Sequence, residues 1–311
     1  MSAKKRKGRA APGGNGRARQ IVVSVVIVLL IGGMIGGVAF GVGALKDRVA
    51  EARSAPLRLE IAWPALAGDA SRTWLPESAR REITAAVMSK LTANPFDRGS
   101  LVRARKALLE TGWFERVDRV RRKTGGVVEI GAVWRTPGAV VRWEGKDYLV
   151  SSKGELLPLV YEAGDAGRSV LVIEGVDVGP TRTSAGAVAY GEAWPGASVR
   201  ASLELMGVLR RAFGAGAAWS QIAGIDASEF RTRGRLAIIS DAGARIVWGA
   251  PPGKLAPGEQ TTEQKLMRLA RLASGPTGRI DSNERYLEIQ GPHVFIDQSA
   301  RMADGSAGGG G

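Results

Sequence analysis

The chain has 311 residues and no cysteine, which excludes disulfide bonds, thiolate catalysis and cysteine metal sites. Its formal net charge is +14, but seven of its 44 basic residues lie in the first 20 positions, where no acidic residue occurs. The rest of the chain therefore has 37 basic against 30 acidic residues, spread along its length. Nucleic-acid-binding proteins concentrate positive charge on one folded face, so this distribution argues against that class.

The first predicted element is a membrane-spanning helix over residues 21–45, which contain no charged residue and one polar side chain, Ser24. About 20 apolar residues at a rise of ~1.5 Å each span the ~30 Å hydrocarbon core of a bilayer. A cleaved signal peptide usually has only about 7–15 apolar residues, so the length favours a retained anchor. Because basic flanks stay in the cytoplasm, residues 1–20 are expected to form a cytoplasmic tail and the later residues to cross the inner membrane. This is the topology of a single-pass type II membrane protein.

Glycines recur every fourth residue in the predicted anchor, at Gly33, Gly37 and Gly41. This spacing makes a smooth helix face on which a second membrane helix can pack closely. Glycine is also common in membrane helices generally, so partner contact and plain anchoring both remain open. A polar linker over residues 46–56 is predicted to follow.

Residues 57–136 are predicted to form a β-α-α-β-β module. Residues 57–63 alternate apolar and polar side chains, as in a half-buried strand. Apolar residues at four-residue spacing over 79–91 predict a helix that ends at Asn94-Pro95, and a second helix is expected from an N-cap at Ser100 to a closing Gly112. A strand, a hairpin turn and a returning strand are predicted to follow at 114–122, 124–126 and 128–134.

Residues 137–297 are predicted to form a mixed β-sheet domain with flanking helices, so the fold class is α+β. Helices are expected near 199–213 and 262–272, and a long loop at 175–195. Strands are expected at 139–143, 148–151, 155–157, 170–173, 222–227, 236–240, 245–248, 285–289 and 293–297. The last two strands pair across Gly291-Pro292, and residues 298–311 are expected to be a disordered tail.

Residues suited to catalysis or cofactor binding are sparse. His293 is the only histidine, so His/Cys metal clusters and Ser-His-Asp sets are not expected. The segment 249–255 superficially resembles a phosphate-binding loop, but it is one residue short and has Leu255 where Ser or Thr should bind magnesium. The sequence therefore predicts no enzyme, no cofactor, no metal and no small-molecule substrate, and favours a protein that binds other proteins.

The order of basic tail, single span, β-α-α-β-β module and β-rich second module resembles the bacterial division proteins FtsQ and DivIB. Local similarities are TGWFERVDRVRR, VVEIGAVWRTPGAVVRW, YLVSSKGELLP, RLAIISDAGARIVWG and RYLEIQGPHVFID. Trp134 stands where the family usually has Glu, Glu288 where it has Asp, and Gln290 where Tyr is common. These departures concern the partner surfaces more than the fold.

The resemblance implies a POTRA module at 57–136, an FtsQ-like β domain at 137–297 and a role as a divisome scaffold at the septum. In the family, the last strands of the β domain bind FtsB, whose partner FtsL joins the complex. Edge strands expose unpaired N–H and C=O groups that accept an added strand, so a similar contact is expected at the C-terminal sheet edge. The predicted partner-binding residues are Tyr286, Leu287, Ile289, Val294, Phe295 and Ile296.

Two other classes stay open at this level. One is a POTRA-containing component of protein secretion or envelope assembly, although no long series of ~10-residue lipid-facing strands occurs in the sequence. The other is an anchored envelope hydrolase, which needs a deep pocket with convergent acidic groups.

Overall fold

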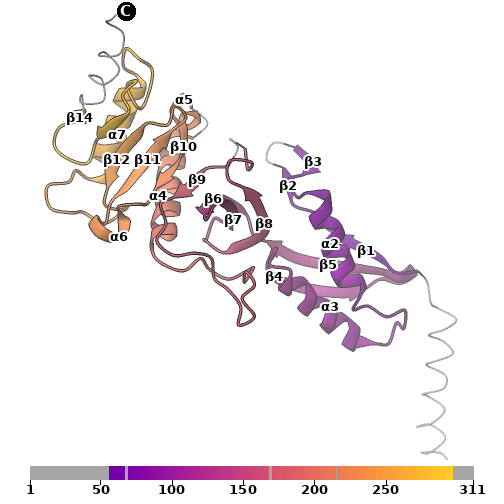
Figure 1. Ribbon diagram of the computed structural model, residues 1–311. Coiled ribbons are helices and arrows are strands. Elements are labelled where there is room, and N and C mark those ends of the chain that lie inside the picture. The colour runs from indigo at the N-terminus through magenta and orange to yellow at the C-terminus, as the bar shows by residue number, and fades with distance from the viewer. Residues whose placement is uncertain (1–55, 67–68, 168–169, 215, 297–311) are drawn as a thin grey trace, which may run out of the picture.

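The computed structural model describes residues 56–66, 69–167, 170–214 and 216–296. The predicted cytoplasmic tail, the anchor with Gly33, Gly37 and Gly41, nearly all of the linker and the C-terminal tail lie outside these residues. Within the described part, no helix is long and apolar enough to cross a membrane. The described chain is α+β, with two modules that lie end to end (Figure 1).

The N-terminal module contains a three-stranded sheet in the order β1-β5-β4, covered by two helices. β1 pairs with β5 in parallel, and β4 pairs with β5 antiparallel. A small β2-β3 hairpin, which the sequence did not predict, lies between β1 and the first helix. The elements are β1 (Arg58–Ile61), β2 (Ala65–Leu66), β3 (Asp69–Thr73), α2 (Glu77–Met88), α3 (Arg98–Glu110), β4 (Phe114–Arg122), the short η1 (Thr124–Gly126) and β5 (Val127–Trp134). The predicted β-α-α-β-β order is thus present with one added hairpin.

Two predicted helix boundaries were wrong. α2 ends at Met88 and not at Asn94-Pro95, because the hydroxyl of Ser89 donates to the Ala86 carbonyl and the next amides make tighter bonds to the third residue back. α3 begins after Asp97, whose carboxylate accepts from the backbone N–H of Ser100 at 3.0 Å. Ser100 is therefore the third helical residue, and its side chain is buried. Asp97 at the N-cap meets the free N–H groups of the first turn.

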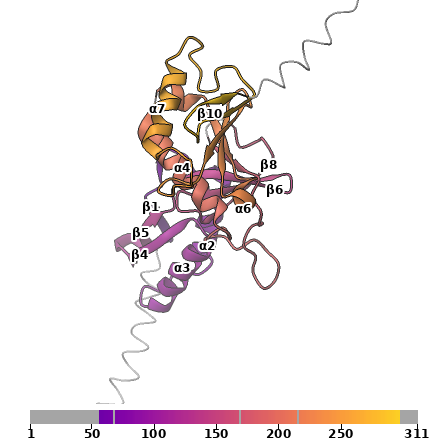
Figure 2. The ribbon, with the colours of Figure 1, turned by 90° about the vertical axis from the view of Figure 1, so that its left-hand side faces the viewer.

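The second module contains a nine-stranded mixed sheet in the order β14-β13-β12-β11-β10-β9-β6-β7-β8. Helices α4 and α7 lie along one face of this sheet (Figure 2). The strands are β6 (Pro137–Trp143), β7 (Lys146–Ser151), β8 (Leu156–Glu162), β9 (Val172–Glu174), β10 (Ile222–Asp226), β11 (Leu236–Ser240), β12 (Arg245–Gly249), β13 (Tyr286–Glu288) and β14 (Phe295–Ile296). The helices are α4 (Ser198–Phe213), α5 (Ala217–Ser220), α6 (Phe230–Arg233) and α7 (Thr262–Ala273).

The predicted strand at 155–157 is longer in the structure, since β8 continues through Pro158 to Glu162. β8 is the last strand of the sheet order, and an edge strand tolerates a proline because its outer backbone groups need no ladder partner. The proline therefore marks an edge and not the end of the strand.

The apolar core of the N-terminal module includes residues of the second module, which also has a separate core of its own. Leu108 and Phe114 of the N-terminal module are buried in the same cluster as Val140, Leu149 and Leu157 of the second module. At about 25 cal/mol per Å² of apolar surface removed from water, such shared burial favours unfolding of both modules together.

Arg135 reinforces this junction between the modules. Its guanidinium donates to the carbonyls of Gly112 at 3.0 Å, Gly191 at 3.1 Å and Phe114, and lies 3.3 Å from the Glu155 carboxylate. One side chain thereby joins the end of α3, the start of β4 and the long loop of the second module.

Candidate protein-interaction edges

The C-terminal strand pair forms one edge of the nine-stranded sheet. β13 and β14 are antiparallel, with Leu287 opposite Ile296 and Glu288 opposite Phe295. β13 continues into the sheet by parallel pairing with β12. In the described part of the chain β14 has a strand neighbour on one side only, so its outer backbone groups have the geometry that accepts a further strand.

The predicted partner-binding residues divide into a buried and an exposed set. Leu287 and Ile289 are fully buried in the core beneath the helices, so their side chains stabilise the sheet. Val294 is 37% exposed and Phe295 is 59% exposed, and these two side chains offer apolar surface at the edge. The backbone of Ile296 belongs to β14.

Tyr286 and the two family departures in this region form one hydrogen-bonded group. The Tyr286 hydroxyl donates to one oxygen of Glu288 at 2.6 Å, and the side-chain amide of Gln290 donates to the other oxygen at 2.9 Å. Burial, with the neighbouring Glu288 carboxylate, raises the pKa of Tyr286 to about 12. Tyr286 therefore stays protonated and acts as a donor at physiological pH.

Arg268 binds the turn that precedes β14, a role that the sequence did not predict. Its guanidinium donates to the carbonyls of Ile289 at 3.0 Å, Gly291, and Pro292 at 2.5 Å. These carbonyls accept from a side chain of α7, so Arg268 ties the turn between β13 and β14 to that helix. In the sequence, Arg268 looks like any cation on the polar face of a helix.

A buried ion pair braces α7 against β12. The Lys265 ammonium lies 2.8 Å from the Glu259 carboxylate, and their side chains are 2% and 8% exposed. The ammonium also lies 5.3 Å from the centre of the Trp248 ring. The Ala250 amide donates to Glu259. In the loop that superficially resembled a phosphate site, this backbone N–H therefore binds a carboxylate of the protein itself.

Trp134, the third departure from the family pattern, has a packing role at the end of β5, beside the junction between the modules. Its ring lies 4.2 Å from the Phe114 ring and 5.8 Å from the Trp63 ring, measured between centres. Its indole N–H donates to the Ala62 carbonyl at 2.9 Å. Trp134 thus packs the end of β5 against the segment that follows β1.

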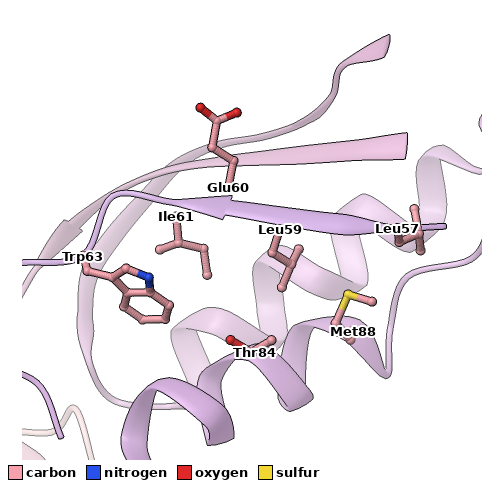
Figure 3. A pocket seen from close by; sticks show the side chains of 7 residues that line it. All are labelled: Leu57, Leu59, Glu60, Ile61, Trp63, Thr84 and Met88. Atoms are coloured by element: carbon pink, nitrogen blue, oxygen red, sulfur yellow. The ribbon is translucent and has the colours of Figure 1, made fainter. Parts of the chain in front are cut away.

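In the N-terminal module, β1 has a strand neighbour on one side only within the described residues, and a groove of about 430 Å³ lies between this strand and α2. Figure 3 shows Leu59 and Ile61 on the α2 side of β1 and Glu60 on the opposite side. The groove is lined by Leu57, Leu59, Glu60, Ile61, Trp63, Thr84 and Met88. Apart from Glu60, which turns away, and the hydroxyl of Thr84, its lining is apolar.

The described residues offer little for metal chemistry. Among them, no group of three or more His, Cys, Asp or Glu side chains could hold a metal ion, and His293 is exposed. No protein-family model matches the chain, and no curated protein matches its sequence. Among the outer strands of the described part, β14 has exposed apolar side chains at its edge and β1 adjoins an apolar groove.

Proposed function

We propose that the protein is a membrane-anchored cell division scaffold similar to FtsQ and DivIB. The observation that carries this proposal is the β13-β14 edge, where an open strand with an exposed Phe295 ends a sheet attached to a β-α-α-β-β module. The charge-free segment 21–45 and its basic flank support an anchor in the inner membrane with a cytoplasmic N-terminus.

In this proposal FtsB-like and FtsL-like membrane proteins are the partners, and the contact is a strand added along β14. Main-chain hydrogen bonds supply affinity in such contacts, while side chains that alternate along the edge supply specificity. Phe295 and Val294 provide the apolar contacts, and Arg268 keeps the preceding turn in shape so that the edge is pre-organised. No catalytic step is part of this function.

The test is co-purification of the full-length protein with FtsB-like and FtsL-like proteins from detergent-solubilised membranes. Phe295→Lys should abolish capture, because it places a charge in the proposed contact. Leu255→Lys is the matched control, since Leu255 is a similarly exposed apolar residue outside this edge. Unchanged capture by Phe295→Lys would refute strand addition at β14.

Depletion of the protein distinguishes the division role from the secretion or envelope-assembly role. A division scaffold predicts long undivided cells with septal localisation of the protein. Stalled assembly of outer-membrane or secreted proteins in cells that still divide would refute the division role.

A further inference from the structure

We propose that β1 is an interface between two copies of this chain, which pair antiparallel through this strand into one continuous sheet. The proposal does not depend on the division role. β1 is an outer strand of its sheet and has a strand neighbour only at β5 in the part of the chain that the structure describes. Its open side adjoins the apolar groove over α2 (Figure 3).

The two segments that directly flank the described residues lack the side chains that the groove needs. An added strand must place apolar residues at alternate positions to cover the groove. Residues 46–55 contain a single large apolar residue, Val49, and residues 298–311 likewise contain only Met302. Neither flanking segment suits the groove, and the apolar segment 21–45 is the predicted membrane anchor, so we take a second copy of this chain as the occupant.

The sequence of β1 is complementary to itself in antiparallel pairing. When a two-fold axis passes beside Leu59, this residue lies opposite Leu59 of the second copy, and Leu57 lies opposite Ile61. The same register places Arg58 opposite Glu60 twice, once on each side of the axis. Apolar pairs then face α2 and oppositely charged pairs lie on the other face, as favourable cross-strand pairing requires.

The neighbouring registers are unfavourable. A shift by one residue places apolar side chains opposite charged ones, because residues along a strand alternate between its faces. Pairing centred on Glu60 brings two carboxylates together, which is destabilising. The charge pattern of the strand thus selects one register and favours a second copy over a foreign peptide.

The charged groups on β1 can make these contacts. Arg58 is exposed and has no ion pair within the described residues. The Glu60 side chain is 58% exposed, and one of its oxygens accepts from Lys123 at 2.8 Å. Its other oxygen can accept from Arg58 of the second copy, because a carboxylate has about four lone-pair sites.

Cysteine cross-linking of the full-length protein in membranes tests the register, and the chain has no native cysteine to interfere. In the proposed pairing the two Cβ atoms at position 59 are about 4.5–5.5 Å apart, close to disulfide range, whereas those at position 60 are about 7–8 Å apart. Leu59→Cys should give a disulfide-linked dimer under mild oxidation, and Glu60→Cys should not. No dimer with Leu59→Cys, equal dimers with both variants, or a cross-link from position 59 only to another protein would overturn the proposal.

Charge reversal gives a second test that does not depend on cross-linking or on a change to the apolar face. Two differently tagged full-length copies are co-purified, and self-association is measured. Arg58→Glu should weaken it about tenfold, since two attractive pairs become repulsive. Arg58→Glu with Glu60→Arg should restore it, and Glu110→Arg, at an exposed position on α3, should leave it unchanged. Association unaffected by Arg58→Glu would overturn the proposed register.

Discussion

The buried pair of Lys265 and Glu259 offers a sharp test of how the second module is held together. Glu259→Gln keeps the shape of the side chain and an acceptor for the Ala250 amide, but leaves the Lys265 ammonium buried without its counter-ion. Lys265→Met keeps the volume and leaves the carboxylate unpaired. Removal of one partner from a buried ion pair costs about 3–5 kcal/mol, so each single variant should be strongly destabilised.

The double variant Lys265→Met with Glu259→Gln should be much more stable than the sum of the single losses implies. It removes both charges while the Gln side chain still accepts from the Ala250 amide, so we expect it within about 1–2 kcal/mol of the wild type. The coupling free energy between the two positions is then several kcal/mol. Additive losses would refute this account of the pair.

Urea unfolding of the full-length protein in detergent, followed by tryptophan fluorescence, measures these free energies. Trp248 is a suitable reporter because its ring lies 5.3 Å from the Lys265 ammonium. Glu110→Gln is the control, since its ion pair with Lys106 on α3 is exposed and an exposed pair contributes only about 0–1 kcal/mol.

Arg268→Met should lower the free energy of unfolding by about 1–3 kcal/mol, because three carbonyls of the β13-β14 turn lose their donor. Amide hydrogen exchange should then become faster at residues 289–296 than in the rest of the sheet. Burial raises the pKa of Asp281, but hydrogen bonds from Arg279 and the Asn283 amide outweigh this effect and lower it to about 2 from 3.8. Because the pKa is lower in the folded state, the ionised carboxylate stabilises the fold by about 2 kcal/mol above pH ~4, and this stabilisation is lost as the pH falls toward 2. Asp281→Asn should therefore lower the free energy of unfolding at pH 7 and make it depend less on pH between 4 and 2, as measured by urea titrations at a series of pH values. Leu108→Ala should lower the free energy of unfolding by about 2–5 kcal/mol, and the protein should still unfold in a single transition. Two separate transitions would contradict the packing of both modules in one cluster.

Periodicity in the sequence predicted most elements because it reflects local backbone geometry. Ile83 and Val87 recur at the helical spacing, and both are buried on the inner face of α2. Leu59 and Ile61 alternate with charged residues as a half-buried strand requires, and the structure places them on the α2 side of β1. Gly112 closes α3 with a φ of +80°, where a Cβ would lie 2.7 Å from the side chain of Tyr190.

Element boundaries were less well predicted, since they depend on competing hydrogen bonds. Both Ser100 and Asp97 are good N-cap residues, and the structure uses Asp97, while the Ser100 hydroxyl donates to the carbonyl of Asp97 at 2.7 Å. The strand predicted at 155–157 continues in the structure through Pro158 to Glu162, because β8 is an outer strand, where proline is tolerated. In both cases the choice depended on neighbours that the local sequence does not specify.

The sequence by itself determined the α+β class, the β-α-α-β-β order of the first module and the β13-β14 pairing. Only the tertiary structure decided that β14 and β1 are outer strands, that Arg268 holds the last turn, and that Lys265 pairs with Glu259 in the core. The physical reason is the distance along the chain over which each feature is determined. The hydrophobic period of an element follows from its own backbone geometry, whereas the partner of an edge strand or of a buried charge is set by which distant segments meet when the chain folds.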